Sequence, residues 1–420
     1  MIQDPGRTYV PRMADVFLHI GLAKTGTTTI QAALDARVEQ LAANGVLFAG
    51  GGHRAQRLAA YDLLGQRIDG DDRDVVAGSL TRLTDEIAAY AGRSVVISEE
   101  ELSHARPRHA RRLVRALEPH RVFVVITVRD LARTLVSSWQ QSIAQGAATR
   151  WPDFIGAVRG DADTAATSEG VSFWLRQDLL RVLDTWGTVV PTERILIVTV
   201  PPPGSSWQVL LDRFADATGL PPGTWASQPV RARNVALGAT ELEVVRRLNE
   251  TIAGRLSTAQ YRFVLEAGIR PRLAVAGSRP LRLPPEDLPW TQDHGRMLSA
   301  ELRRRGHPVV GDLCDLVPRS ESVPCATPID VPDDDDLLAV SEAVLAALAL
   351  AHGALFKRYR RAFFERQGRR PSPAEVAGSS ARAAGFWAKK VALRSADHHR
   401  ILARAARAYL HRTSRSRLRG

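Results

Sequence analysis

The chain has 420 residues, of which 45% are hydrophobic and 24% are charged. That balance excludes an intrinsically disordered chain, which has fewer apolar residues, and a protein built mainly of membrane spans, which has long uncharged runs. The formal charge of +12 is unevenly distributed, because the segment from Lys357 to the end carries +15 and the preceding chain −3. Two cysteines, Cys314 and Cys325, are too few for a disulfide scaffold and lack the spacing of a thiolate metal site, so they favour a reducing compartment.

The first two hundred residues alternate between short β-branched runs and longer helical patterns, which predicts a parallel sheet with helices on its faces. The predicted strands span residues 16–21, 46–48, 94–98, 122–128 and 195–200. The predicted helices span residues 27–43, 74–90, 109–117, 131–145, 173–186, 207–218 and 241–252. Five prolines between residues 270 and 289 predict a loop or lid. Four acids, residues 333–336, precede an apolar run, where they are expected to stabilise the first turn of a helix; a metal cluster is the less favoured alternative.

The expected fold is therefore a three-layer α/β/α structure with a central parallel sheet and a P-loop-like phosphate-binding loop, followed by a mainly helical C-terminal region. We divide the chain into four parts. Residues 1–13 are a flexible extension and residues 14–255 the α/β core. Residues 256–350 complete the core or the acceptor site, and residues 351–420 form a basic helical extension.

A glycine-rich segment follows the first predicted strand and opens a helix, an arrangement that binds anions through backbone N–H groups and the helix dipole. In HIGLAKTGTTT, Gly21 and Gly26 have the spacing of the nucleotide-triphosphate loop G-x-x-x-x-G-K-[ST], but Thr27 occupies the position of its lysine. Lys24 is the only lysine among the first 356 residues, whereas 53 of the 57 basic residues are arginine. This usage indicates that a compact ammonium is needed at Lys24. The alternative is a turn whose Gly and Thr residues only satisfy cap geometry.

A second anion-binding feature follows the strand RVFVVITV. Arg129 stands at the carboxyl end of that strand, where ligands of such sheets bind, and Ser137 lies eight residues later in the next helix. Arginine suits a bidentate grip on phosphate, which the Ser137 hydroxyl would complete. Two separate phosphate grips at one sheet edge indicate a nucleotide that is phosphorylated at two positions.

These segments resemble those of the sulfotransferases that use 3′-phosphoadenosine 5′-phosphosulfate (PAPS), in particular the bacterial members of that family. HIGLAKTGTTTIQ is similar to the family's 5′-phosphosulfate loop, and VVITVRDLARTLVSSW is similar to its 3′-phosphate motif, with the same interval of eight between Arg and Ser. The resemblance is specific over about residues 16–145 and weaker to about residue 255.

The resemblance implies PAPS as sulfonate donor, 3′-phosphoadenosine 5′-phosphate (PAP) as product, and no metal requirement. The residues that it implies for the 5′-phosphosulfate are Lys24, Thr25, Gly26, Thr27 and Thr28. Arg129 and Ser137 would hold the 3′-phosphate, and Arg233, in the segment 231–234, would close over the nucleotide. Ala23 departs from the family, where proline often precedes the lysine.

Sulfonate transfer is an in-line displacement in which negative charge builds on the leaving phosphate, so a flexible cation there stabilises the transition state; Lys24 is the candidate. The acceptor hydroxyl must also lose a proton, and a positioned base contributes about 10²–10⁴ in rate. The segment SVVISEEEL ends in carboxylates at the same sheet edge. By resemblance Glu99 is the first candidate for the base and Glu100 the second. The alternative is that these acids only begin a helix or turn.

Other residues carry weaker signals. His19, inside a strand, is expected to pack in the core, and His53 and His104 are expected to be solvated, although either would serve as base or substrate contact. Trp139 is expected either near the adenine or in the core.

The basic tail is the last feature. Arg400, Arg404 and Arg407 recur at helical spacing beside apolar residues, a pattern compatible with an anionic membrane surface, a nucleic acid, a polyanionic glycan or a solvated helix. We expect peripheral membrane contact and no specific nucleic acid. Because VFLHIGLA leads into Lys24 and not into a small-residue cleavage site, we expect a cytoplasmic protein, peripheral at the inner membrane face.

The function expected from the sequence is a PAPS-dependent sulfotransferase that acts on a hydroxyl of a glycan, a glycolipid or a small metabolite. Two alternatives remain open. One is a small-molecule kinase that uses ATP and magnesium, and the other is a nucleic-acid or membrane-binding module whose basic tail carries the function.

Overall fold

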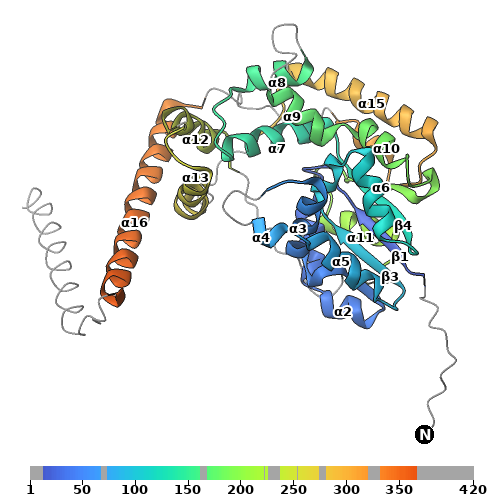
Figure 1. Cartoon of the computed structure of the whole chain (residues 1–420). Helices are drawn as coiled ribbons and strands as arrows, with labels where there is room; N and C mark the ends of the chain where they lie inside the picture. The colour runs from blue at the N-terminus through green and yellow to red at the C-terminus, as the bar shows by residue number, and fades with distance from the viewer. Residues whose placement is uncertain are drawn as a thin grey trace, which may run out of the picture. The chain divides into compact units, whose positions relative to one another are not determined.

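A computed structural model of the chain describes residues 13–67, 73–160, 168–221, 223–225, 237–252, 254–273, 281–319 and 332–366. The chain forms two compact units, residues 1–348 and 349–420. The first unit contains the whole sheet and its covering helices (Figure 1). Residues 256–348 fall in the same unit as the sheet. Several predicted features lie outside the described residues: the N-terminal extension to residue 12, the segment 231–234 with Arg233, Cys325, and Arg400, Arg404 and Arg407 of the basic tail.

The central sheet has six parallel strands in the order β2-β3-β1-β4-β5-β6, which confirms the predicted α/β class and parallel sheet. Its strands are β1 (Asp15–His19), β2 (Val46–Phe48), β3 (Ser94–Ser98), β4 (Arg121–Val128), β5 (Ile195–Thr199) and β6 (Val309–Val310). The five predicted strands agree with β1 to β5 to within two residues at each end. Of these six strands only β6 was not predicted, because two valines between Pro308 and Gly311 are too short a run to carry a strand pattern.

Helices occupy most of the remaining chain. In the first half they are α1 (Thr27–Asp35), α2 (Val38–Ala43), α3 (His53–Leu64), α4 (Arg73–Val76), α5 (Ser79–Ala88), α6 (Pro107–Ala116), α7 (Leu131–Ala144), α8 (Trp151–Arg159), α9 (Ser168–Gln177) and α10 (Leu179–Trp186). Later come α11 (Trp207–Thr218), α12 (Ala239–Ile252), α13 (Thr258–Arg262), α14 (Arg270–Leu273), α15 (Leu288–Arg305) and α16 (Asp334–Arg366). The short 3-10 turns are η1 (Ala49–Gly51), η2 (Glu100–His104), η3 (Thr192–Arg194), η5 (Pro285–Asp287) and η6 (Leu313–Leu316), and η4 (Phe263–Ile269) is a π-helix.

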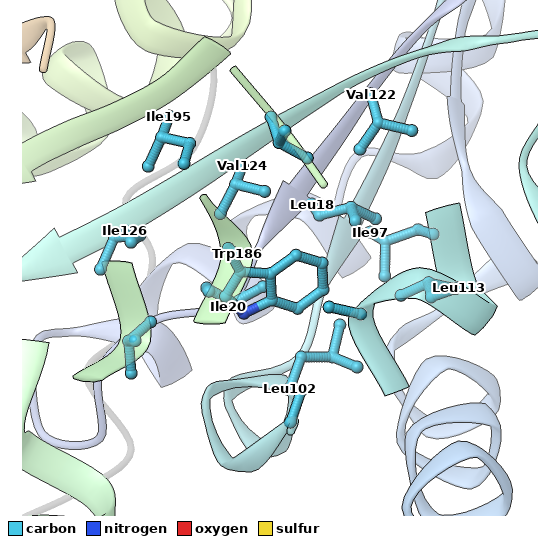
Figure 2. Packing of buried hydrophobic residues seen from close by; sticks show 14 of the residues in the cluster. Leu18, Ile20, Ile97, Leu102, Leu113, Val122, Val124, Ile126, Trp186 and Ile195 are labelled. Atoms are coloured by element: carbon cyan, nitrogen blue, oxygen red, sulfur yellow. The ribbon is translucent and has the colours of Figure 1, made fainter. Parts of the chain in front are cut away.

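Alternation along the strands sends side chains to two hydrophobic layers. On one face, Leu18, Val124 and Ile197 pack against α3, α5, α6, α10 and α15, and Figure 2 shows the Trp186 ring of α10 in this layer. On the other face, neighbouring residues such as Phe17 pack against α1, α2 and α11. A buried parallel sheet covered on both faces accounts for the near-continuous apolar runs in the strands. A third cluster joins α7, α8, α9 and α12, and α7, α8, α9 and α15 lie together in Figure 1.

Three predicted helices are interrupted. The helix expected over residues 74–90 is divided at Gly78, whose φ of 73° is left-handed, so that α4 ends at Val76 and α5 begins at Ser79. The helix expected over residues 27–43 ends at Asp35, and α2 resumes at Val38, because Arg37 adopts a non-helical φ of −131°. The helix expected over residues 173–186 is divided at Asp178, whose side chain accepts a hydrogen bond from the backbone N–H of Arg181 and so caps α10. Capping by aspartate competes with helix continuation, and the apolar periodicity did not reveal it.

The acidic run at the start of α16 lies where helix capping predicts it, with Asp334, Asp335 and Asp336 in the first turn. Within the described residues no cluster of His, Cys, Asp and Glu forms a metal site. The loop predicted over residues 270–289 is wrong in part, because its described residues include α14, η5 and the first two residues of α15. Among the described helices, α16 contains a stretch, Asp334–Phe363, that is long and apolar enough to cross a membrane, with a mean hydropathy of 1.8 over its most apolar 18 residues.

Candidate functional site

The strand order creates a crevice between β1 and β4. The connection after β1 runs by α1 towards β2, at one edge of the sheet. The connection after β4 runs by α7 towards β5, in the direction of the other edge. Ligands of open parallel sheets bind where neighbouring connections diverge in this way. Both predicted anion-binding segments lie at this point, since Gly21–Gly26 follows β1 and Arg129 follows β4.

The loop after β1 has an unusual backbone. Gly21 and Gly26 have φ angles of 64° and 89°, and a Cβ on Gly26 would lie 2.5 Å from Leu210 Cδ2 of α11. Lys24 has a φ of 66° and is, among the described residues, the one non-glycine residue in the left-handed region. Such a conformation costs on the order of 1–3 kcal/mol and is found mainly at functional sites. Gln177 Nε2, donating to Ala23 O at 2.9 Å, helps to hold it.

A buried polar network supports the loop from below. His19 Nδ1 lies 2.7 Å from Ser98 Oγ, and His19 Nε2 lies 3.1 Å from Thr127 Oγ1. Thr25 Oγ1 contacts Thr127 Oγ1 and donates to Leu22 O at 2.6 Å. Burial lowers the pKa of His19 to about 3, so the ring is neutral and acts as a packed linker between three strands, as the sequence predicted. The hydroxyl of Thr25 is used internally, which leaves only its backbone N–H for a ligand.

The side chain of Lys24 borders a cavity and is surrounded by other charges. Burial is the main influence and lowers the pKa of Lys24, the Glu100 carboxylate raises it, and three arginines lower it again. These are Arg270, Arg129 and Arg176. A half-buried ammonium among three guanidinium groups favours an anion beside it, because an anion would offset both the burial and the repulsion.

Arg129 is tied to the same loop. Its Nη1 donates to Lys24 O at 3.1 Å, while its buried Nε finds no hydrogen-bond partner among the described residues. Burial lowers the pKa of Arg129 to about 10, which leaves it charged at pH 7. The adjacent Asp130 pairs with Arg133. A buried charged donor without a partner is costly, so Arg129 is prepared for an anionic acceptor.

Two cavities adjoin at this point and share Arg129, Ser137 and Gln140 in their walls. The first, of about 570 Å³, is bounded by the loop residues Lys24, Gly26, Thr27 and Thr28. The second, of about 460 Å³, combines charged residues with apolar ones; its walls include Arg133, Arg282, Arg319, Asp315, Pro202, Pro203, Leu281 and Leu283. Each volume falls in the range of small-molecule sites. A ligand that extends from one cavity into the other would pass Arg129 and Ser137.

The acids after β3 occupy different places. Glu100 borders the first cavity and accepts a hydrogen bond from the Thr27 hydroxyl. Glu99 is fully buried, is not part of the cavity wall, and accepts a hydrogen bond from the backbone N–H of Glu101, so it caps η2. Its Oε2 lies 3.5 Å from His53 Nε2. Burial raises the pKa of Glu99 to about 7.

Of a further pair at the cavity, the sequence singled out only His104, and expected it to be solvated, whereas its side chain is 15% exposed. His104 Nδ1 lies 3.0 Å from Glu101 Oε2, and both residues border the first cavity. The hydrogen bond from His104 lowers the pKa of Glu101. Their separation of three residues within a short turn was the available signal. It was weak, because such a pair on an exposed helix looks the same in sequence.

Other cavity residues carried no sequence signal. Arg176 and Arg270 border the first cavity, and Arg282 and Arg319 the second, but in a chain with 53 arginines no single one stands out. Trp139 does not border either cavity; it is buried in the α7–α12 cluster, where its Nε1 donates to Thr149 O at 2.9 Å, so of its two predicted places the core is the observed one. Arg233 lies outside the described residues.

Comparison of the chain with family models, with curated proteins and with solved structures finds no match. The function of the site therefore has to be argued from its own geometry and charge.

Proposed function

We propose that the protein is a PAPS-dependent sulfotransferase that transfers the sulfonate group to an acceptor hydroxyl. One observation carries the proposal: Lys24 and Arg129 lie together at the β1–β4 crevice, where the Arg129 guanidinium donates a hydrogen bond to the backbone carbonyl of Lys24. Both residues border the first cavity, and Arg129 also borders the second. Each cation is half-buried, and the buried Nε of Arg129 awaits an acceptor. This arrangement suits a nucleotide with one phosphate on each side of the pair.

The residues present fit the donor. Lys24, Gly26, Thr27 and Thr28, together with the backbone N–H of Thr25, would hold the 5′-phosphosulfate at the start of α1, where the helix dipole favours negative charge. Gly26 precedes that helix without a side-chain cap, which leaves the first turn open to a ligand. The 3′-phosphate would bind Arg129 and Ser137. The mixed walls of the second cavity suit the nucleoside.

The reaction exchanges one sulfur–oxygen bond for another. The acceptor oxygen bonds to sulfur, the bond between sulfur and the 5′-phosphate oxygen breaks, and PAP leaves with the electron pair. The Lys24 ammonium would neutralise the charge that builds on that oxygen, an effect of about 10²–10³ in rate for one such donor. The acceptor proton passes to a carboxylate at the cavity wall.

The structure favours Glu100 over Glu99 as that carboxylate. A base must come within about 3 Å of the proton that it removes, and of these two glutamates only Glu100 borders the cavity. Glu99 has a structural role, because its side chain caps η2, the turn that carries Glu100. The order of preference expected from the sequence is thus reversed.

The test is a thermodynamic cycle on the 3′-phosphate. Calorimetry of the wild type and of Arg129→Ala with PAP and with adenosine 5′-monophosphate gives four affinities. We expect Arg129→Ala to weaken the binding of PAP by a factor at least ten times larger than the factor for adenosine 5′-monophosphate. The reason is that only PAP carries the phosphate that Arg129 would bind. Equal losses for the two ligands would show that Arg129 does not contact a 3′-phosphate.

A kinase that uses ATP and magnesium is the second candidate, and one contact favours it. Glu100 lies at the end of β3, beside β1, and accepts a hydrogen bond from Thr27 of the loop, where a carboxylate and a loop hydroxyl would together bind magnesium. Against it, the loop lacks a lysine after Gly26, and Lys24 stands two residues earlier. The two candidates differ in their need for metal.

The acceptor class is a separate proposal. The walls of the first cavity are polar and charged, and a hydroxyl of a glycan or glycolipid is compatible with them. A cytoplasmic location would give access to the donor.

A further inference from the structure

The second unit begins at residue 349, and its described part is the C-terminal half of α16. This half, residues 349–366, exposes five large apolar side chains to 45–68% of their surface. They are Leu350, Leu355, Phe356, Tyr359 and Phe363. The rings of Tyr359 and Phe363 stack, with their centroids 6.5 Å apart. Scattered exposed hydrophobic residues are common, but five within fourteen residues form a patch that indicates an interaction surface.

Helical geometry orders this patch. At 3.6 residues per turn, Leu355, Phe356, Tyr359 and Phe363 fall within a sector of about 100°. We call these four residues the aromatic face. Four of the five basic residues of the same segment fall on the remaining sides of the helix; they are Lys357, Arg358, Arg360 and Arg361, whereas Arg366, at the end of the helix, falls within the sector. Leu350 lies outside the face. The segment is thus a basic amphipathic helix with an apolar side rich in aromatic rings.

We propose that residues 349–366 bind an anionic membrane surface, with the aromatic face inserted at the level of the lipid headgroups. Aromatic side chains favour this interface, and each basic side chain near an anionic surface contributes about 1 kcal/mol of attraction. This inference does not depend on the proposed function.

Two other arrangements would also cover the aromatic face: a second copy of the helix, and a bilayer that the helix crosses. Charge argues against the first of these. A second copy of the helix, packed with its aromatic face on this one, would bring Arg358 and Arg360, which flank the face, close to the same residues of the other copy, and like charges at that distance repel. Crossing of the bilayer along the whole apolar length is opposed by Val340 and Val344, which belong to the hydrophobic cluster of the first unit. The helix therefore lies on the surface rather than across it.

The experiment is flotation of the full chain with vesicles. One set contains phosphatidylcholine with about 30% phosphatidylglycerol and the other phosphatidylcholine alone. The test variant replaces Phe356, Tyr359 and Phe363 by serine, and Leu350→Ser is the matched control, because Leu350 is 62% exposed on the same segment but lies outside the aromatic face. We expect the wild type and the control to float with anionic vesicles at least tenfold better than the test variant, and the wild type to lose binding on neutral vesicles.

Three results would overturn the proposal. Unchanged flotation of the triple-serine variant would assign binding to another part of the chain, such as residues 367–420. Retention on vesicles at pH 11 would indicate a spanning helix. A vesicle-free dimer in analytical ultracentrifugation that the triple-serine substitution abolishes would identify a second copy as the occupant.

Discussion

At Lys24 both the backbone and the side chain are held in costly states. The backbone lies at a φ of 66°, and burial lowers the pKa of the ammonium. Hydrogen bonds to the carbonyls of Ala23 and Lys24 from Gln177 and Arg129 hold the loop in that conformation. A fold retains such strain where the surrounding structure imposes it, and here it brings a single ammonium to the cavity.

Lys24→Ala should abolish sulfonate transfer while the chain remains folded, and Lys24→Arg should restore less than a tenth of the activity. The guanidinium is larger, planar and less flexible than the ammonium, so it would not reach the same point from a left-handed backbone position. Transfer of labelled sulfonate, with circular dichroism as the folding control, measures this. An arginine variant as active as the wild type would refute the argument from the lone lysine.

The two adjacent glutamates should respond differently. Glu100→Gln should lower turnover by a factor of about 10²–10⁴ with little change in PAP affinity, because the change removes the proposed base but no residue that would bind the nucleotide. Glu99→Gln should leave turnover within tenfold of the wild type, since the amide oxygen still caps η2.

Glu99→Gln should instead change how stability depends on pH. The pKa of Glu99 is raised from the ordinary value of 4.5, which applies to the unfolded chain, to about 7 in the folded chain. The folded chain therefore holds the proton more tightly, and the stability that this proton contributes is fully present below pH 4.5 and is lost as the pH rises to 7. The glutamine variant has no proton to lose, so between pH 4.5 and 7 its free energy of unfolding should gain on the wild type by up to about 3 kcal/mol. Urea unfolding at both pH values measures this; a large loss of turnover in Glu99→Gln would make Glu99 the base after all.

The sequence patterns singled out the residues that we propose to bind phosphate more reliably than the residues around them. The lone lysine and the interval from Arg129 to Ser137 identified residues that do meet at one crevice. The order of Glu99 and Glu100 could not be derived, because adjacent residues leave a strand in opposite directions and sequence does not say which one faces the ligand. Arg176 and Arg270 come from distant helices, so only the tertiary fold brings them together.

The loop between β1 and α1 depends on close packing as well as on φ. Gly26 approaches Leu210 of α11, whereas Gly204 has a similar φ of 85° with no atom near the position of a Cβ. Alanine substitutions at the two glycines therefore distinguish two costs: that of a left-handed alanine, which both variants bear, and that of the close contact with Leu210, which only the Gly26 variant bears.

Gly204→Ala should destabilise the chain by about 1–2 kcal/mol, the cost of a left-handed alanine. Gly26→Ala should cost more and should weaken PAP binding by at least tenfold, because a Cβ 2.5 Å from Leu210 Cδ2 forces the loop to move. Urea unfolding and calorimetry of both variants measure this. Equal behaviour of the two variants would show that α11 does not fix the loop.

Apolar periodicity predicted the strands and most helices because burial of β-branched runs between two helical layers decides them. It failed at Asp178 and Arg37, where capping and a local backbone turn interrupt a continuous apolar pattern. It also failed at Val309–Val310, which is recruited to the sheet by pairing with β5. Short edge strands depend on tertiary contacts that no local pattern encodes.

Across the whole molecule, the alternation of strands and helices predicted the parallel α/β class, and the sheet order then accounts for the site. With β1 between β3 and β4, the loop after β1, Glu100 after β3 and Arg129 after β4 meet at one edge. The strand order itself was not predicted, because crossover rules fix handedness but leave several orders open. The crevice that we propose as an anion site thus follows from topology once the order is known.

The central claim is a site for a nucleotide with phosphates at the 3′ and 5′ positions that needs no metal. Calorimetric titration of the full chain with PAP in the presence of a chelator, beside ATP with magnesium, tests it most directly. The account predicts micromolar or tighter binding of PAP without metal and at least tenfold weaker binding of ATP with magnesium. Binding of ATP with magnesium in the absence of PAP binding would contradict it and would assign the Glu100–Thr27 contact to a kinase.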